Sequence, residues 1–369
     1  MTDKNRKETL VDLITLSSIE GIGPNRLYQL IGGLGSAEKV LDSPISRLSE
    51  IHGISRQIAS VIHEKQNRAE SEKIVRRITE LGWKYYLYTD KDYPEPLINI
   101  SDRPPYLFYL GNYSDEDQNA IAIVGSRTAS ESGRLFADQL ASALADHNIT
   151  VISGMARGID TCAHRGALKS GGRTLAVFGS SLDIIYPPEG RKNAVEIINN
   201  GCIFSEYMPG TKPYGPNFPK RNRIISGLSQ GVVVIEAAER SGALSTAGHA
   251  LAQNREIFAV PGSPRSSTSR GTNKLIKEGA VLLTSVEDIF DALPRLKGRA
   301  TAGQVKNLNE LTQTEKLLID MFADEPIHID NLARMMKTPV TDLMPVILAL
   351  ELRGIIRELS GKRYILSME

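Results

Sequence analysis

The sequence has 369 residues, of which 41% are hydrophobic, and this combination predicts two or three domains with full cores. The formal net charge is only +1, with 44 basic and 43 acidic residues, so a nucleic-acid binder of this composition must gather its positive charge locally. Two cysteines, no clustered metal ligands, no apolar leader and no apolar run of membrane-spanning length lead us to expect a cytoplasmic protein without disulfides, metal, cofactor or membrane partner.

Residues 1–75 are predicted to be all-helical and to form a domain of the SAM or helix-hairpin-helix type. Residues 16–31 (LSSIEGIGPNRLYQLI) and 48–62 (LSEIHGISRQIASVI) share a hydrophobic-Gly-hydrophobic-Gly/Ser pattern before an amphipathic helix. The glycines of such hairpins let backbone N–H groups face a DNA phosphate. The second copy has Ser55 in place of the second glycine and no basic cluster beyond Arg56. A DNA contact and a purely structural bundle both remain open.

Residues 83–110 are strand-like and interrupted by prolines, which predicts an extension at the edge of a sheet. Many of the aromatic side chains lie in this segment, namely Trp83, Tyr85, Tyr86, Tyr88, Tyr93, Tyr106, Phe108 and Tyr109. Aromatic side chains also serve as stacking platforms for bases. Packing within an edge extension is the commoner use, and we favour it for this segment.

Seven short apolar runs lie between residues 121 and 284: IAIV (121–124), TVIS (150–153), TLAVF (174–178), CIFS (202–205), VVVIE (232–236), IFAV (257–260) and VLLT (281–284). Each run is apolar on both faces, as a parallel strand covered by helices on both sides must be. Residues 83–293 are therefore predicted to form an α/β domain, an extended Rossmann-like and mostly parallel sheet with flanking helices.

Glycines and basic residues follow several of these runs directly. They are Gly125, Ser126 and Arg127 after the first run, Gly154 and Arg157 after the second, and Arg240 after the fifth. Open α/β sheets bind ligands outside the carboxyl ends of their strands, where helix starts direct free N–H groups outward. The pattern predicts a ligand that carries phosphate.

The fourth run is followed by a loop with Tyr214 and Phe218, and then by a helix that begins with Lys220, Arg221 and Arg223. Guanidinium groups bind phosphate oxygens in a bidentate fork. Aromatic side chains beside a basic helix start suit a single strand, whose unstacked bases need a platform. We therefore expect this helix start to join the arginines at the strand ends in one site for single-stranded DNA.

A nucleotide-binding hydrolase or sensor is the alternative. Neither a Gly-x-Gly-x-x-Gly fingerprint after the first strand nor a Walker A lysine motif is present. Residues 241–250 (SGALSTAGHA) resemble the Pro-Gly-Gly-x-Gly-Thr-x-x-Glu segment of nucleotide phosphoribohydrolases, but His249 stands where the catalytic glutamate belongs when Thr246 is aligned. Helix capping and turn formation account for Asp160 and Asp183. We therefore expect no catalytic residues.

Residues 294–310 lack apolar periodicity and are predicted to be a linker. Residues 311–369 follow the winged-helix pattern, with three amphipathic helices and then a hairpin that turns at Gly361. This segment has seven basic and nine acidic residues, and its third helix carries Asp342, Glu351 and only Arg353 as a base. Because phosphate repels an acidic recognition helix, a protein-contact role is favoured over DNA reading.

The chain closely resembles the DprA/Smf family of DNA-processing proteins. The motifs that carry the resemblance are GSR (125–127), SGMARGID (153–160), FPKRNRIISGLS (218–229), SGALSTAGHALAQNREIFAVPG (241–262) and GTNKLIKEGA (271–280). The resemblance extends from the helical N-terminus through the winged-helix end, and its central motifs are the specific ones.

The resemblance implies a non-enzymatic binder of single-stranded DNA that forms homodimers through its Rossmann-like domain. It also implies that the protein protects incoming DNA and loads RecA onto it during natural transformation, with single-strand-binding protein as a further candidate partner. Carried over by motif, Arg127 and the helix start at 220–223 grip phosphates. Gly125, Ser126 and Gly154 then let the backbone approach the strand.

Overall fold

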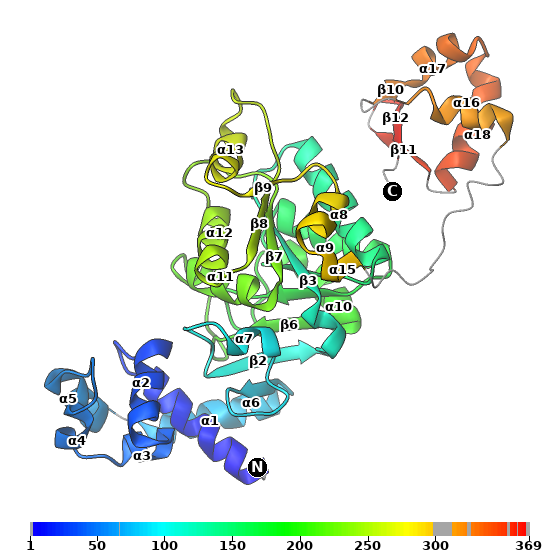
Figure 1. Ribbon diagram of the computed structural model, residues 1–369. Coiled ribbons are helices and arrows are strands. Elements are labelled where there is room, and N and C mark those ends of the chain that lie inside the picture. The colour runs from blue at the N-terminus through cyan, green and yellow to red at the C-terminus, as the bar shows by residue number, and fades with distance from the viewer. Residues whose placement is uncertain are drawn as a thin grey trace. The chain divides into compact units, whose positions relative to one another are not determined.

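The computed structural model describes residues 3–65, 67–297, 312–322, 326–352, 355–359 and 361–366. The chain divides into two compact units, Met1–Arg299 and Ala300–Glu369. The first unit holds the sheet and the N-terminal helices, and the second holds the C-terminal helices and hairpin (Figure 1).

The first unit is built on a nine-stranded sheet with the order β1-β2-β6-β5-β4-β3-β7-β8-β9. The strands are β1 (Lys84–Leu87), β2 (Tyr106–Gly111), β3 (Ala120–Val124), β4 (Thr150–Ser153), β5 (Thr174–Val177), β6 (Gly201–Ser205), β7 (Gly231–Val234), β8 (Glu256–Ala259) and β9 (Val281–Leu282). The seven strands from β3 to β9 pair in parallel, while β1 and β2 form an antiparallel extension beside β6. The predicted α/β fold class and the edge extension are confirmed.

Helices cover both faces of this sheet (Figure 1). One layer contains α8 (Glu131–Asp146), α9 (Ile159–Lys169), α10 (Arg191–Asn200) and α14 (Val286–Ala292). The other contains α7 (Glu95–Ile98), α11 (Asn217–Leu228), α12 (Gly242–Ala252) and α13 (Arg270–Lys277). In β3, Ile121 and Ile123 pack into the α8–α9 core, whereas Ala122 and Val124 pack into the α11–α12 core. Burial on both faces explains why these strands are apolar at every position.

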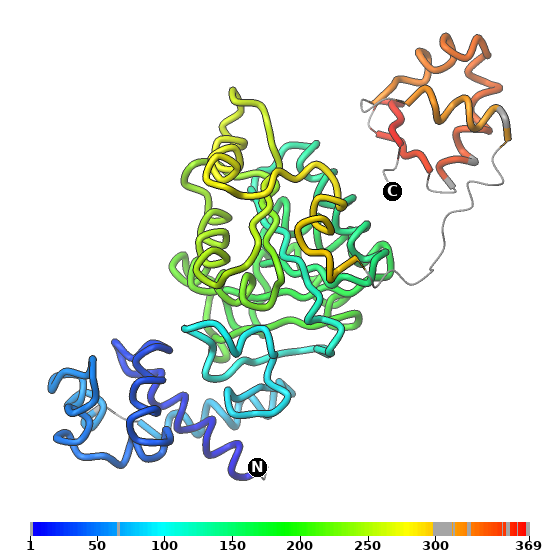
Figure 2. The backbone as a smooth tube through the Cα atoms, in the orientation of Figure 1, coloured from blue at the N-terminus to red at the C-terminus, as the bar shows by residue number. Residues whose placement is uncertain are grey.

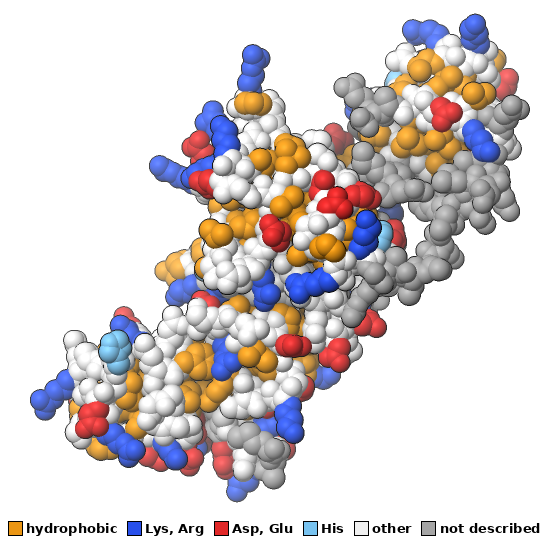
Figure 3. All heavy atoms as spheres, in the orientation of Figure 1, with side chains coloured by type: hydrophobic (Ala, Val, Ile, Leu, Met, Phe, Trp, Pro, Cys, Tyr) orange, Lys and Arg blue, Asp and Glu red, His pale blue; other side chains and the backbone are white. Residues whose placement is uncertain are grey.

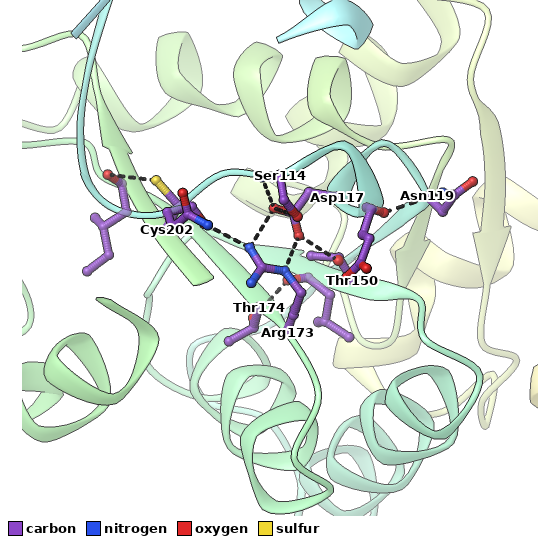
Figure 4. Close-up of polar contacts among 11 residues, drawn as sticks. Ser114, Asp117, Asn119, Thr150, Arg173, Thr174 and Cys202 are labelled. Atoms are coloured by element: carbon purple, nitrogen blue, oxygen red, sulfur yellow. Dashed lines mark hydrogen bonds and ion pairs between the residues drawn. The ribbon is translucent and has the colours of Figure 1, made fainter. Parts of the chain in front are cut away.

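A buried carboxylate joins three chain segments at the amino ends of the strands (Figure 4). Asp117 lies in a short 3-10 helix (Asp115–Gln118) before β3 and is fully buried. It accepts hydrogen bonds from Arg173 Nε at 2.8 Å and Nη2 at 2.7 Å, and from Thr150 Oγ1 at 2.8 Å. Thr150 begins β4 and Arg173 directly precedes β5. This network therefore stabilises the edge of the sheet opposite to the carboxyl ends of the strands.

The N-terminal region consists of helices and contains two helix-hairpin-helix units, as predicted. Its helices are α1 (Asp3–Ser17), α2 (Pro24–Leu34), α3 (Ala37–Leu41), α4 (Ile45–Ser49), α5 (Arg56–Lys65) and α6 (Arg68–Glu80). The hairpins join α1 to α2 and α4 to α5, and Gly21 (φ +89°) and Gly53 (φ +82°) supply the left-handed backbone of the two turns.

The N-terminal helices share one hydrophobic core with the sheet. Leu10, Leu13 and Ile14 of α1 belong to the same buried cluster as Trp83 and Phe108 at the β1–β2 edge. Figure 2 shows the helices alongside these strands. Although the sequence predicts residues 1–75 as a domain of their own, the structure makes them part of one compact unit with the sheet. Removing them would expose this shared core to water.

The aromatic side chains of the edge extension are packed, as predicted. Trp83, Tyr86, Tyr93, Tyr106 and Phe108 are each no more than 7% exposed. Tyr86 and Tyr109 stack with ring centroids 4.5 Å apart, and Trp83 lies 5.7 Å from Phe108. Their buried rings are therefore part of the core and offer no surface on which a base could stack.

The second unit has the predicted winged-helix order. It contains α16 (Gln313–Ile319), β10 (Ile327–His328), α17 (Ile329–Met336), α18 (Val340–Leu352), β11 (Ile356–Leu359) and β12 (Arg363–Leu366). The sheet order is β10-β12-β11, and Gly361 (φ +80°) lies in the turn between β11 and β12. Arg353, the base expected on the third helix, is outside the described residues.

The first four residues of the predicted linker are helical. Pro294–Lys297 forms the short helix α15, and Leu296 is buried against the α8–α9 core. The rest of the predicted linker, residues 298–310, lies outside the described residues. Within the described ranges, no helix has the length and apolar character that crossing a bilayer requires.

Candidate nucleic-acid interface

The strand order places a crevice between β3 and β7. From β3 the chain continues outward through β4, β5 and β6 on one side, and it later returns to add β7, β8 and β9 on the other. Ligands of open α/β sheets bind at such a switch point, outside the carboxyl ends of the strands. A cavity of about 650 Å³ opens at this position, and it is lined by Gly125, Ser126 and Arg127 after β3 and by Ser241 and Gly242 after β7.

Two glycines allow close packing around the loop after β4, beside the cavity. A Cβ atom on Gly154 would lie 2.5 Å from Arg221 Nη2 and 2.8 Å from Asp160 Oδ2. Gly158 has a φ of +76°, and a Cβ there would collide with the carbonyl oxygen of Ser126. The loop after β4 therefore requires glycine at both positions, at Gly154 because the Arg221 and Asp160 side chains pack there and at Gly158 because the loop after β3 approaches closely.

Arg127 presents a free positive charge at the cavity. Its side chain is exposed, and it forms no hydrogen bond or ion pair with any residue that the structure describes. Its guanidinium carbon lies 5.1 Å from the centroid of the Phe218 ring, a cation–π contact. Phe218 is half-buried, and its ring also lies 5.8 Å from that of Tyr186. The ring of Phe218 thus holds Arg127 in place and is less open to a base than the sequence predicts.

Arg221 is buried, although the sequence predicts an exposed basic start of helix α11. It is only 4% exposed, and its Nη1 donates hydrogen bonds to the carbonyl oxygens of Gly154, at 2.7 Å, and Val177. Burial lowers the pKa of Arg221 to about 10, and the nearby Asp160 opposes this shift. The guanidinium is committed to joining the ends of β4 and β5 to α11, so it supports the cavity wall and is not free to bind phosphate.

Asp160 has a structural role on the same wall. Its Oδ2 accepts hydrogen bonds from the N–H groups of Gly154, at 3.1 Å, and Ala156, at 3.2 Å. Burial raises the pKa of Asp160, while Arg221 and these two N–H groups act in the opposite direction. Asp183 accepts a hydrogen bond from the N–H of Gly210 at 3.2 Å. Both aspartates thus hold loop backbone, in keeping with the capping and turn roles that the sequence predicts for them.

Arg223 is also buried and paired, although the sequence predicts it to be exposed. Its Nη2 donates a hydrogen bond of 2.6 Å to Glu206, its Nε lies 3.4 Å from Asp102, and its side chain is 8% exposed. Burial raises the pKa of the Glu206 carboxyl, and Arg223 lowers it. Of the three basic residues at the start of α11, only Lys220 is exposed. In Figure 3, Lys and Arg side chains are scattered over this face of the molecule, with several around α13.

The remaining predicted residues lie around the cavity mouth. Arg157 is exposed and forms an ion pair with the exposed Glu189, a weak surface contact that a phosphate can replace. Arg240 is exposed and directly precedes Ser241, which lines the cavity. Tyr214 is 64% exposed, and both of its chain neighbours line the cavity. Tyr214 is therefore the more accessible of the two aromatic residues predicted to stack on bases.

Sequence reasoning missed Tyr186. This side chain lines the cavity, is 38% exposed and lies beside Phe218. It comes from the loop after β5, so its position after a strand end was a usable signal, although no basic residue accompanies it. His249, which replaces the glutamate of the phosphoribohydrolase segment, lies with Nε2 3.2 Å from the carbonyl oxygen of Pro219.

Comparisons with known proteins match most of the chain. Residues 84–294 match the model of the family described as DNA recombination-mediator protein A. The chain belongs to the DprA/Smf family. Residues 304–362 match the DprA winged helix domain, and residues 13–65 match the SAM-like helix-hairpin-helix tandem. Protein Smf from Synechocystis sp. is 30% identical over 383 residues, which cover 94% of this chain and 96% of that protein.

Two solved structures of the family are similar. DNA processing protein A from Streptococcus pneumoniae aligns with a TM-score of 0.65 and 32% identity, over 76% of this chain and 95% of that one. The Helicobacter pylori protein aligns with a TM-score of 0.52 and 29% identity, over 58% of this chain and 96% of that one. The Helicobacter structure is described as revealing a single-stranded DNA binding mode.

Proposed function

We propose that this DprA/Smf family member binds single-stranded DNA at the switch-point cavity, protects the incoming strand, and loads RecA onto it in natural transformation and homologous recombination. The observation that carries the proposal is the free Arg127 guanidinium, held over the cavity by Phe218 between glycine-rich loops. Free guanidinium and N–H donors suit a phosphate, and the neighbouring Tyr186 and Tyr214 suit an unstacked base. The Helicobacter relative, described by its DNA binding mode, supports the same assignment.

We propose that the protein acts as a mediator without enzymatic activity. Asp160 and Asp183 are engaged with loop backbone, and His249 replaces the carboxylate that a phosphoribohydrolase needs. A general acid or base must be within hydrogen-bond reach of its substrate. Neither aspartate has the freedom expected of such a group, which favours binding over hydrolysis.

We expect affinity to increase with strand length. Fluorescence anisotropy with oligothymidylates of about 4 to 16 nucleotides should show tighter binding as the strand contacts more basic residues. Affinity should also fall as salt increases, with a slope of about −0.7 log units per neutralised phosphate. A nucleotide sensor would instead saturate with a mononucleotide and gain nothing from a longer strand. That result, or release of free base from nucleoside monophosphates, would contradict the proposal.

We infer that the protein acts in the cytoplasm as a homodimer, with RecA as its principal protein partner and single-strand-binding protein as a further one. Exposed leucines support an interface between copies. Leu251 on α12 is 71% exposed, and Leu282 on the edge strand β9 is 47% exposed. Burying such side chains in a protein interface is favourable.

The winged helix is proposed to contact protein. Met344 and Leu348 lie one turn apart on α18 and are 41% and 53% exposed, and Asp342 adds a negative charge near the start of the same helix. Exposed apolar side chains and a negative charge on the same helix are better suited to a protein surface than to phosphate.

Deleting residues 311–369 should leave the single-strand affinity unchanged, because the deletion leaves the compact unit with the cavity intact. The truncated protein should be slower to start RecA on strands coated with single-strand-binding protein, read as a longer lag before ATP hydrolysis. The lag of the full-length protein on the same coated strands is the reference. Loss of DNA binding in a truncated protein that remains folded and dimeric would identify the winged helix as a DNA reader instead.

A further inference from the structure

A second cavity lies between the first hairpin and the sheet. It has a volume of about 820 Å³ and contains the hairpin residues Gly21, Ile22 and Gly23 on one side and Lys220 and Arg223 of α11 on the other. The residues that line it include the basic side chains of Arg26, Lys220 and Arg223 and the two carboxylates of Asp102 and Glu206. Both carboxylates are paired with Arg223, so Lys220 and Arg26 set the sign of the remaining charge.

The two hairpins differ at the helix start that follows each turn. Helix α5 is capped by its own sequence, since Ser55 Oγ accepts a hydrogen bond from the N–H of Ile58 at 3.2 Å. Helix α2 begins after Gly23, which has no side chain to cap it, and Pro24 occupies the first turn. The N–H groups of the first turn of a helix have no acceptor within the helix. Those of α2 therefore remain available to an external anion, whereas α5 has satisfied one of its own.

A buried donor in the same cavity also lacks a partner. Arg223 is 6% exposed, and while its Nε and Nη2 face Asp102 and Glu206, its Nη1 is buried without a hydrogen-bond partner in the described part of the chain. Leaving a buried donor unpaired costs about 1–3 kcal/mol. An acceptor placed in the cavity would remove that cost, and a phosphate oxygen is such an acceptor.

The hairpin cavity adjoins the switch-point cavity at the start of α11. Phe218 lines the switch-point cavity, Lys220 lines the hairpin cavity, and Pro219 between them lines both. One extended chain with a phosphate at each nucleotide can therefore contact Arg127 in the first cavity and Lys220 in the second without leaving the surface.

We propose that the first hairpin is a second phosphate-binding site for the same DNA strand, which passes from the switch-point cavity over Pro219 to the start of α2. The inference rests on the proposed function and extends it to the N-terminal helices. The second hairpin lines neither cavity and has its own serine cap, so it serves as a packing element.

The test compares one added charge at matched positions of the two hairpins. Asn25 is the second residue of α2 and lines the hairpin cavity, and Gln57 is the exposed second residue of α5. Glutamate is favourable near a helix N-terminus, so Asn25→Glu and Gln57→Glu should both fold at least as stably as the wild type. Anisotropy is measured for each full-length variant with oligothymidylates of about 5 and about 16 nucleotides.

Asn25→Glu should weaken binding of the long strand about tenfold and lower its salt slope by about 0.7, because a charge-assisted contact becomes a repulsion. Binding of the short strand, which the switch-point cavity accommodates, should not change, and Gln57→Glu should behave as the wild type with both. If Asn25→Glu and Gln57→Glu bind the long strand equally while Arg127→Ala loses both strands, the hairpin inference is wrong and the proposed function stands. If Arg127→Ala binds both strands as the wild type does, the proposed function itself fails.

Discussion

Arg127→Ala is expected to weaken binding of single-stranded DNA about ten- to hundredfold, because a hydrogen bond to a charged group contributes about 1.5–3 kcal/mol. The guanidinium has no protein partner to lose among the described residues except the Phe218 ring. The variant should therefore unfold at the wild-type urea concentration. Anisotropy titrations at several salt concentrations provide the measurement, and the slope against log salt should become shallower by about 0.7 for each lost phosphate contact.

Lys169→Ala is the matched control for this prediction. Lys169 is exposed and is the last residue of α9, whereas the loop that borders the cavity precedes the first residue of this helix. The substitution therefore removes one positive charge, as Arg127→Ala does, but at a distance from the cavity. Adding Lys220→Ala to Arg127→Ala should reduce the slope further, because Lys220 is also exposed and unpaired within the described ranges. Equal slopes for the Arg127 and Lys169 variants would show that Arg127 makes no phosphate contact.

The parallel strands were predictable because the physics at each one is simple. A strand buried on both faces must be apolar at every position, as Ile121, Ala122 and Ile123 are. The structure places all seven predicted runs in strands with ends displaced by no more than a few residues. The cavity position follows from the same facts, since consecutive strand ends that carry glycine and arginine must meet at one edge of the sheet.

The orientation of the basic residues on α11 was not predictable in the same way. Lys220, Arg221 and Arg223 are close in sequence, but at about 100° per residue they point in different directions around the helix. The carboxylates that act on them lie in other segments of the chain: Asp160, in the first turn of α9, influences Arg221, and Glu206, directly after β6, pairs with Arg223. A run of basic residues therefore predicts local positive charge without showing which guanidinium is exposed.

The packing of the N-terminal helices against the sheet could not be predicted from the sequence either. An amphipathic pattern shows that a helix has a buried face, but it does not identify what covers that face. Here Leu10 and Leu13 of α1 share a core with Trp83 and Phe108. The difference between Gly23 and Ser55 was visible from the start, but its meaning required the structure to show that one helix start lines a cavity and the other is capped.

Arg221→Ala is expected to destabilise the protein by about 3–5 kcal/mol, the usual cost of leaving a buried charge without compensation. The change leaves Asp160 buried beside an empty space and breaks the hydrogen bonds to the carbonyl oxygens of Gly154 and Val177. Urea unfolding monitored by circular dichroism provides the measurement. In contrast to Arg127→Ala, this variant should lose DNA binding only in proportion to its unfolded fraction.

The pH dependence of that loss identifies its cause. Burial already raises the pKa of Asp160 above its ordinary value, and removing Arg221 removes the largest opposing influence. The folded variant should then bind a proton more readily than the unfolded chain, so its stability relative to the wild type should recover as pH falls through the raised pKa. Asp160→Asn in the Arg221→Ala background should produce the same recovery at neutral pH. A variant that keeps the wild-type urea midpoint but loses DNA affinity would instead identify Arg221 as a phosphate contact, as its position in the sequence first indicates.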